Sequence, residues 1–279
     1  MINQIGLTRR EFLSTASAAA IVLSGRSNAD VFLVDGDYGP FRMGMQSYTL
    51  RAFSFDRAIE LTQKFGLHYW ESYQAHIGLT EDHDKLSSIA DKLTSNKILL
   101  MGWGVQAFDS DAAKSRKIFE FAKKLKIKTI TADPNPESFD SLEKLCEEFK
   151  ISIAIHNHGP GARYDKISSV EAAIKGRSRR IGACVDTGHF LRSGEDPVEA
   201  IQRFGEKVHS VHLKDVKGKT QFTEIGLGDL RTVALFKALK KLSYRKIVAL
   251  EYEEHEKDPV VYIDACLSAT KDAISKAIA

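Results

Sequence analysis

Four apolar runs in the second half of this 279-residue chain each end in a residue with metal-binding chemistry. The runs lie in SIAIHNHGP, GACVDTGHF, VHSVHLKDV and KIVALEYEE, and they end at His156, Asp186, His212 and Glu251. Short apolar runs of this kind predict buried strands. Two imidazoles with two carboxylates suit one divalent first-row ion, such as Mn, Co, Zn or Fe, better than Mg or Ca, which prefer oxygen ligands. If the four strand ends converge, the sequence predicts a metal site there.

Each of these residues also has an ordinary structural explanation when it is taken alone. A histidine at a strand end is often hydrogen-bonded rather than metal-bound, Asp186 could cap the following turn, and Glu251 could pair with a lysine. Four such groups on consecutive strands favour the metal site, because charges gathered at one rim need compensation and a cation supplies it. The other histidines are expected in structural or solvent-exposed positions: His68, His76, His83, His209 and His255.

Two further residues stand beside the expected ligands. His158 follows His156 by two positions, so both face the same side of an extended strand. Its ordinary pKa lies near neutrality, and we predict that it moves a proton during catalysis; a role as a second metal ligand stays open. Lys214 follows His212 by two positions and could stabilise an oxyanion.

The elements that must position these residues alternate along the chain. Eight strand-like runs begin near residues 42, 68, 98, 128, 152, 182, 208 and 246, and segments with the helical spacing of apolar residues lie between them. Ser54 is predicted to cap the first helix, and Asp196 the sixth, with Pro197 at its first position. A last helix is expected from about Asp258 to the end of the chain.

Eight strand–helix units predict a single (β/α)8 TIM barrel, in which functional residues lie at the carboxyl ends of the strands. The alternative is a doubly wound open sheet. Such a sheet usually carries a Gly-rich dinucleotide turn after its first strand, and the segment QSYTLRAFSF has none.

The first residues of the chain differ from the rest. LTRREFLSTASAAAIVLSG pairs Arg9 and Arg10 ahead of an apolar run that is too short to span a bilayer, as in a signal peptide. The paired arginines resemble a twin-arginine export signal. We expect residues 1–29 to be this signal, cleaved before Asp30, and residues 30–279 to be the barrel, exported to the periplasm with no membrane span. An amphipathic first helix of the mature fold is the alternative.

Composition narrows the range of partners. Apolar residues make up 43% and charged residues 28% of the chain, as in an ordinary soluble protein. The formal charge of +3 falls to +1 without residues 1–29, so nothing favours nucleic acid or an anionic membrane as a partner. Cys146, Cys184 and Cys266 cannot all pair, which predicts no disulfide framework.

The motifs AIHNHGP, CVDTGHF, VHLKD and ALEYE, in this order and spacing, resemble those of the xylose-isomerase-like barrel superfamily. This superfamily contains sugar phosphate isomerases/epimerases, ketose 3-epimerases, inosose dehydratases and, more distantly, endonuclease IV. The resemblance covers nearly all of the chain after the signal segment and is strongest over residues 150–253. It implies a metal-dependent enzyme that acts on a small carbohydrate.

In the ketose epimerases the resemblance implies ligands Glu, Asp, His and Glu, and the two glutamates also act as the acid/base pair. Here His156 stands in place of the first glutamate, so the two-carboxylate scheme does not carry over directly. The sequence His156-Asn157-His158 is more similar to the corresponding strand end of the inosose dehydratases. Glu251 keeps both implied roles, as a metal ligand and as a catalytic group.

Substrate contacts are assigned to four residues. The resemblance implies that His189, three positions after Asp186, contacts the substrate. Glu71 and Glu253 are candidates for hydrogen bonds to substrate hydroxyls. Trp103, at the expected end of the third strand, is a candidate to stack on a sugar face, with core packing as the alternative.

The expected chemistry begins with a metal ion that polarises a carbonyl and an adjacent hydroxyl, after which a base removes the acidified C–H proton to give an enediolate. Reprotonation gives isomerisation or epimerisation, and we predict a sugar isomerase/epimerase. Expulsion of a β-oxygen would instead give a lyase/dehydratase, acting on an inosose-like substrate or a 3-keto-glycoside. Export, and the lack of a phosphate cradle of the P-loop kind, favour an unphosphorylated keto sugar.

Two other classes of function are considered. A phosphodiesterase similar to endonuclease IV would need several metal ions and a basic face, whereas the sequence shows one ligand set. A non-catalytic sugar-binding barrel would not need metal ligands together with an additional histidine. The sequence leaves open the substrate, the metal, and whether the protein is a monomer or a homo-oligomer.

Overall fold

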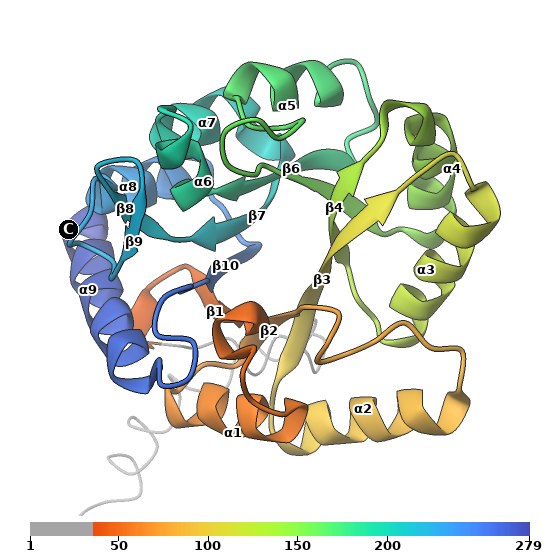
Figure 1. Ribbon diagram of the computed structural model, residues 1–279, viewed down its shortest axis with the longest axis horizontal. Helices are drawn as coiled ribbons and strands as arrows, with labels where there is room; N and C mark the ends of the chain where they lie inside the picture. The colour runs from red at the N-terminus through yellow and green to blue at the C-terminus, as the bar shows by residue number, and fades with distance from the viewer. Residues whose placement is uncertain (1–35) are drawn as a thin grey trace, which may run out of the picture. The chain divides into compact units, whose positions relative to one another are not determined.

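A computed structural model describes residues 36–279. Figure 1 shows a ring of parallel strands surrounded by helices. The predicted signal segment lies outside the described residues. Within them, no helix combines the length and the apolar character needed to cross a membrane.

The barrel has eight parallel strands. Each strand pairs with the barrel strand that comes next in the sequence, and the last strand pairs with the first to close the ring. The strands are β1 (Arg42–Gln46), β2 (Tyr69–Ser72), β3 (Leu99–Phe108), β4 (Thr129–Pro134), β5 (Ser152–His156), β6 (Ile181–Asp186), β7 (Val208–Leu213) and β10 (Ile247–Leu250). Each strand falls on one of the eight predicted runs, and the closed ring excludes the open-sheet alternative.

The helices cover the outside of the barrel with their apolar faces (Figure 1). They are α1 (Phe55–Lys64), α2 (His83–Ser95), α3 (Ala112–Lys124), α4 (Phe139–Phe149), α5 (Ile167–Ile174), α7 (Pro197–Phe204), α8 (Thr232–Lys241) and α9 (Val260–Ile278). The predicted caps are confirmed: the Ser54 side chain accepts a hydrogen bond at the start of α1, and Asp196 does so at the start of α7. Pro197 occupies the first position of α7, where its missing N–H costs no intrahelical bond.

Several short elements were not predicted. Helix α6 (Thr187–Arg192) follows β6 directly, and a hairpin of β8 (Asp215–Lys217) and β9 (Gln221–Thr223) follows β7. The remaining elements are single 3-10 turns: η2 (Gly36–Tyr38), η3 (Ser47–Leu50), η4 (Pro136–Ser138) and η5 (Gly205–Lys207).

Asp215 holds the chain that follows the hairpin. Its carboxylate accepts hydrogen bonds from the backbone N–H groups of Val216, Gly226, Gly228 and Leu230. A Cβ atom at position 228 would lie only 2.2 Å from Asp215 Oδ1, so this close approach requires glycine. The acid of the VHLKD motif therefore has a structural role, and it shapes the loop beside the barrel mouth.

Candidate metal centre and active site

The four predicted metal ligands meet at the carboxyl end of the barrel. His156 and Asp186 are the last residues of β5 and β6, His212 is the penultimate residue of β7, and Glu251 follows β10 directly. All four are buried, and one ligand atom from each lies within 4.8 Å of the others. The structure thus brings together the set that the sequence predicted.

The ligand atoms of this cluster face one another. His156 Nε2 lies 3.2 Å from Asp186 Oδ2 and 3.1 Å from His212 Nδ1, and His212 Nδ1 lies 2.8 Å from Glu251 Oε2. Burial lowers the pKa of His156 to about 4, so this ring is neutral and has a free lone pair. Asp186 Oδ2 and Glu251 Oε2 are buried and accept no hydrogen bond of ordinary geometry. Nitrogen and oxygen donors arranged in this way fit a divalent first-row ion.

Lys214 is the buried cation of the site. Its Nζ lies 2.9 Å from Asp186 Oδ2 and 3.0 Å from Glu251 Oε2, and it also donates to Glu253. Burial alone would lower the pKa of Lys214, but Asp186, Glu251 and Glu253 together hold it well above its usual value. The three carboxylates exceed this ammonium by two negative charges, and two positive charges are what a divalent ion would bring.

Glu71 lies inside the barrel, behind the cluster. It is fully buried in β2, and Oε1 accepts hydrogen bonds from His212 Nε2 at 2.9 Å, Thr131 at 2.6 Å and Gln46 at 3.1 Å, while Oε2 accepts one from Ser210 at 3.1 Å. Burial opposes a charge on His212, but Glu71 and Glu251 hold its pKa well above the usual value, so without a metal both ring nitrogens carry protons. The hydrogen bond to Glu71 fixes the proton on Nε2, and a metal ion would take the place of the proton on Nδ1.

This position corrects the prediction that Glu71 binds substrate hydroxyls. Glu71 does not line the cavity, and its two oxygens are already occupied by four donors. Gly102 on β3 makes room for it, since a Cβ there would lie 2.9 Å from Glu71 Oε2. Glu71 therefore holds the His212 ring in place and does not reach the cavity.

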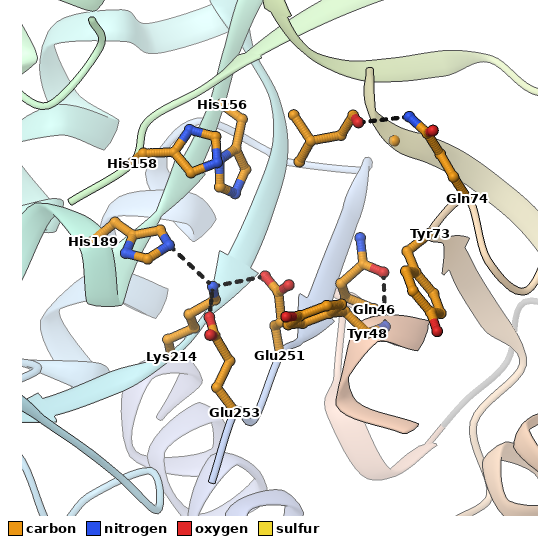
Figure 2. A pocket seen from close by; sticks show the side chains of 12 residues that line it. Gln46, Tyr48, Tyr73, Gln74, His156, His158, His189, Lys214, Glu251 and Glu253 are labelled. Atoms are coloured by element: carbon orange, nitrogen blue, oxygen red, sulfur yellow. Dashed lines mark hydrogen bonds and ion pairs between the residues drawn. The ribbon is translucent and has the colours of Figure 1, made fainter. Parts of the chain in front are cut away.

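A cavity of about 390 Å³ opens directly onto the cluster (Figure 2). Six of the predicted site residues line it: His156, His158, His189, Lys214, Glu251 and Glu253. The His158 ring is packed edge-on against His156, with ring centroids 4.5 Å apart. Burial lowers the pKa of His158, which favours its neutral form. The spacing of two residues has placed both rings on one side of the strand end, as predicted.

His189 is oriented from both sides. Its backbone N–H donates to Asp186 Oδ1 at 2.8 Å, and its ring Nδ1 lies 3.2 Å from Arg192 Nη1. Burial lowers the pKa of His189 to about 3, so the ring is neutral. The Arg192 guanidinium at Nδ1 and the Lys214 ammonium at Nε2 can both only donate, so the ring accepts a hydrogen bond from one of them and carries its proton on the other nitrogen. His189 is thus a neutral polar group at the cavity wall, facing Lys214 (Figure 2).

Trp103 does not reach the cavity, and the predicted stacking role is wrong. β3 continues to Phe108, so Trp103 lies in the middle of a strand rather than at its end. Its ring packs on Phe121 of α3, with ring centroids 5.1 Å apart, and its Nε1 donates to the Ile77 carbonyl at 2.8 Å. Trp103 is a fully buried core residue.

The aromatic side chains that do line the cavity are Tyr48 and Tyr73, which sequence reasoning missed together with Gln46 and Gln74. Tyr48 is 36% exposed, its ring lies 5.5 Å from that of Tyr73, and the Arg51 guanidinium lies 4.6 Å over it. Figure 2 shows this pair across the cavity from His158 and His189. Tyr48 lies just beyond the end of β1, and Tyr73 directly follows β2. A search of the strand ends for uncharged polar and aromatic residues, as well as for charged residues and histidines, would have found them.

Comparison with known proteins agrees with this geometry. Residues 59–273 match the family described as xylose isomerase-like TIM barrel. The chain belongs to this family. The match confirms the resemblance seen in the four strand-end motifs. It covers every barrel strand except β1.

Two curated relatives match part of this xylose isomerase-like chain. The rhizopine catabolism protein MocC of Rhizobium meliloti is 27% identical over 143 residues, which are 44% of this chain and 43% of that protein. An inosose dehydratase of Geobacillus kaustophilus is 26% identical over 136 residues, 42% of this chain and 43% of that protein. The matched part of the chain therefore spans less than half the length of either relative.

Two solved structures share the fold over most of the chain. The IOLI protein with a bound zinc atom superposes with a TM-score of 0.72 at 19% identity, covering 85% of this chain and 99% of that one. An L-ribulose 3-epimerase superposes with a TM-score of 0.70 at 16% identity, covering 85% and 96%. At these identities the two structures bear on the fold alone.

Proposed function

We propose that this barrel is a metal-dependent enzyme that removes the proton next to the carbonyl of a keto sugar or a related hydroxyketone, as an isomerase or epimerase does. The observation that carries the proposal is the buried cluster of His156, Asp186, His212 and Glu251 at the floor of the cavity. A divalent ion held by these residues would supply Lewis-acid polarisation of the carbonyl and an adjacent hydroxyl.

The protein's own groups would move the proton and hold the developing charge. His158 stands at the cavity wall beside the cluster as a neutral ring, so it can accept a proton from carbon. Glu251 faces the same cavity from β10 and is the second proton carrier. The Lys214 ammonium lies 3.0 Å from Glu251 Oε2 and would stabilise an oxyanion, because it is charged and held in place before the substrate arrives.

The remaining lining residues would bind the substrate. The His189 imidazole and the Glu253 carboxylate offer hydrogen-bonding groups for hydroxyls, and Gln46 and Gln74 carry amides at the opposite wall. The half-exposed ring of Tyr48 offers an apolar face for the C–H groups of a sugar. This lining is typical of a site for a polar, uncharged carbohydrate.

Elimination of water or an aglycone is the second candidate outcome. It is supported by the histidines at positions 156 and 158, since the resemblance implies a glutamate at 156 in the ketose epimerases. The similarity to inosose dehydratases points the same way. Elimination requires a proton for the leaving oxygen, and His158 could return the proton that it has taken.

One experiment separates these outcomes. The metal-loaded protein is incubated in deuterated water with keto sugars, inososes and 3-keto-glycosides, and the products are followed by NMR. Deuterium uptake at the carbon beside the carbonyl without bond cleavage supports the isomerase/epimerase, and loss of water or aglycone supports the lyase. Sugar binding without exchange or product, with Mn, Co, Zn and Fe each tried, would leave a non-catalytic binding barrel. Asp186→Ala serves as the metal-free control.

We also propose that the protein acts in the periplasm on an unphosphorylated substrate. The support is the paired Arg9 and Arg10 ahead of a short apolar run. Phosphorylated sugars are cytoplasmic metabolites, so export and an unphosphorylated substrate belong together.

A further inference from the structure

A second cavity lies at the end of the barrel where the strands begin, away from the metal cluster. Its volume is about 290 Å³. Five basic side chains line it, and none of the described residues that line it is acidic. The basic residues are Arg42, Lys128, Lys150, Arg180 and Lys246. We call this cavity the basic pocket.

The barrel register fixes this convergence. The Ser152 backbone N–H donates to the Lys128 carbonyl at 2.9 Å, and the Ile153 N–H donates to the Arg180 carbonyl at 2.9 Å, so the starts of β4, β5 and β6 lie side by side. Across the barrel, Arg42 pairs in register with Ile247, the residue after Lys246. The cations therefore come from strands that are far apart in sequence but held rigidly together.

The charges of the basic pocket are poorly compensated. Lys150 and Arg180 each lie 3.4 Å from one carboxylate, Glu147. Within residues 36–279, no carboxylate comes within ion-pair distance of Arg42, Lys128 or Lys246. The whole chain has a net charge of only +3 and contains 37 acidic residues. The concentration of positive charge here is thus local, and the cations repel one another.

The innermost cation, Lys246, is held by neutral groups. Its Nζ donates to the Val208 carbonyl at 2.7 Å and to His209 Nδ1 at 2.5 Å, and His209 Nε2 donates to the Arg179 carbonyl at 3.0 Å. Burial and then the Lys246 charge lower the pKa of His209 to about 3, so the ring is neutral. Burial also lowers the pKa of Lys246 to about 8. The Glu206 carboxylate, which lies beyond ion-pair distance, opposes this shift only in part. A partly desolvated ammonium with so little counter-charge is costly, and an anion would compensate it.

We propose that the basic pocket binds a small multivalent oxyanion of the phosphate class, either free or as a phosphate ester. The side chains of Arg42 and Lys128 offer charged donors, and the hydroxyls of Thr129 and Ser152 line the same cavity. The cations surround a concave space rather than forming a stripe, which fits a compact anion better than an extended polymer. This site lies at the opposite end of the strands from the catalytic cavity and is independent of the proposed reaction.

Thermal unfolding with inorganic phosphate tests the proposal. The midpoint is measured against phosphate concentration, with sodium chloride holding the ionic strength constant. A ligand that binds only the folded state raises the midpoint, and above its dissociation constant the rise grows with the logarithm of the ligand concentration. We compare the wild type with Arg42→Gln/Lys128→Gln, and use Lys64→Gln/Lys237→Gln as the control. The control makes the same change in charge at exposed positions on α1 and α8.

We expect the midpoints of the wild type and the control to rise with phosphate concentration, while the basic-pocket variant needs at least about tenfold more phosphate for the same rise. Without phosphate and at low salt, this variant should unfold at the same or a higher temperature than the wild type, because repulsion is relieved. Asp186→Ala should keep the full phosphate response, which separates the basic pocket from the metal cluster.

Three results would overturn the proposal. The first is an equal phosphate response in the wild type and the basic-pocket variant. The second is a response to phosphate no larger than the response to chloride. The third concerns a single-stranded oligonucleotide. If it binds more tightly per phosphate group than inorganic phosphate does, these cations bind a nucleic-acid polymer instead.

Discussion

Replacing Glu71 by glutamine tests whether this buried carboxylate tunes the metal site. Glu71 touches neither the cavity nor the predicted metal position, and it acts through its hydrogen bond with His212 Nε2. The amide has nearly the same shape as the carboxylate. Its oxygen can keep the three donors that now reach Oε1, and its NH2 group can donate to Ser210, which accepts as readily as it donates. The substitution therefore removes the charge and leaves the hydrogen bonds satisfied.

The expected magnitude follows from that difference. A hydrogen bond to a charged partner contributes about 1.5–3 kcal/mol, and a neutral one about 0.5–1.5 kcal/mol. Losing about 1–1.5 kcal/mol from the His212–Glu71 pair should weaken metal binding roughly tenfold. Substitutions of groups that orient a metal-bound histidine typically cost 10–100-fold in affinity, and an isosteric change that keeps the bonds should lie at the lower end.

The assay is a competitive titration of the metal against a chromophoric chelator, with circular dichroism confirming that the variant is folded. Thr131→Val is the matched control, because it removes one donor to Glu71 at 2.6 Å but leaves the contact between Glu71 and His212 in place. We expect a smaller loss of affinity in this control. Metal affinity of Glu71→Gln equal to that of the wild type would refute the role assigned to Glu71.

Four further predictions concern the site and the export of the protein. Asp186→Ala should lose its bound metal by elemental analysis, and a metal content equal to that of the wild type would contradict the ligand set. His158→Gln should keep its metal while turnover falls by roughly 10²–10⁴; if metal is lost as well, His158 is a ligand. Tyr48→Ala should raise KM more than it lowers kcat, because the ring binds substrate without touching the reacting proton; an effect confined to kcat would argue otherwise. Replacing Arg9 and Arg10 by lysines should leave an uncleaved precursor in the cytoplasm, detected by mass, and unchanged export would indicate another route.

The convergence of the four candidate metal ligands could be predicted from the sequence because their pattern is local. An apolar run of a few residues that stops at a histidine or an acid marks a strand end, and a parallel barrel brings all its carboxyl ends to one rim. The outcome does not depend on helix packing or on loop structure. His156 and His158 share a side for the same reason, since alternation along an extended chain needs no tertiary information.

Glu71 and Trp103 were misplaced for different reasons. Glu71 is near the end of β2, but its side chain is held inside the barrel by four hydrogen-bond donors, whereas Trp103 lies in the middle of β3. Gly102 faces Glu71 inside the barrel, so its neighbour Trp103 points outward to α3. The segment ILLMGWGVQ does not show where β3 ends, and the strand continues to Phe108. The sequence pattern alone could therefore not tell a strand end from a strand middle here.

The contacts of Lys214 lay beyond sequence reasoning for a different reason. Its pairing with Glu253 joins two loops that follow different strands, and its distances to Asp186 and Glu251 depend on the closure of the barrel between β7 and β10. The hairpin of β8 and β9, which Asp215 supports, follows Lys214 directly. Such contacts between loops are set by the completed fold.

The buried charges also explain how this site can form before any metal binds. Asp186 is fully buried and Glu251 is 7% exposed, and two such carboxylates without a cation would destabilise the fold through repulsion and desolvation. Lys214 lies about 3 Å from both, and its charge, after opposing the effect of burial, keeps the pKa of Asp186 well below its usual value. One ammonium balances only one of three carboxylates, because Glu253 pairs with it too. The ammonium thus offsets part of the cost of burying these carboxylates, while the remaining negative charge would favour a divalent ion in the proposed site.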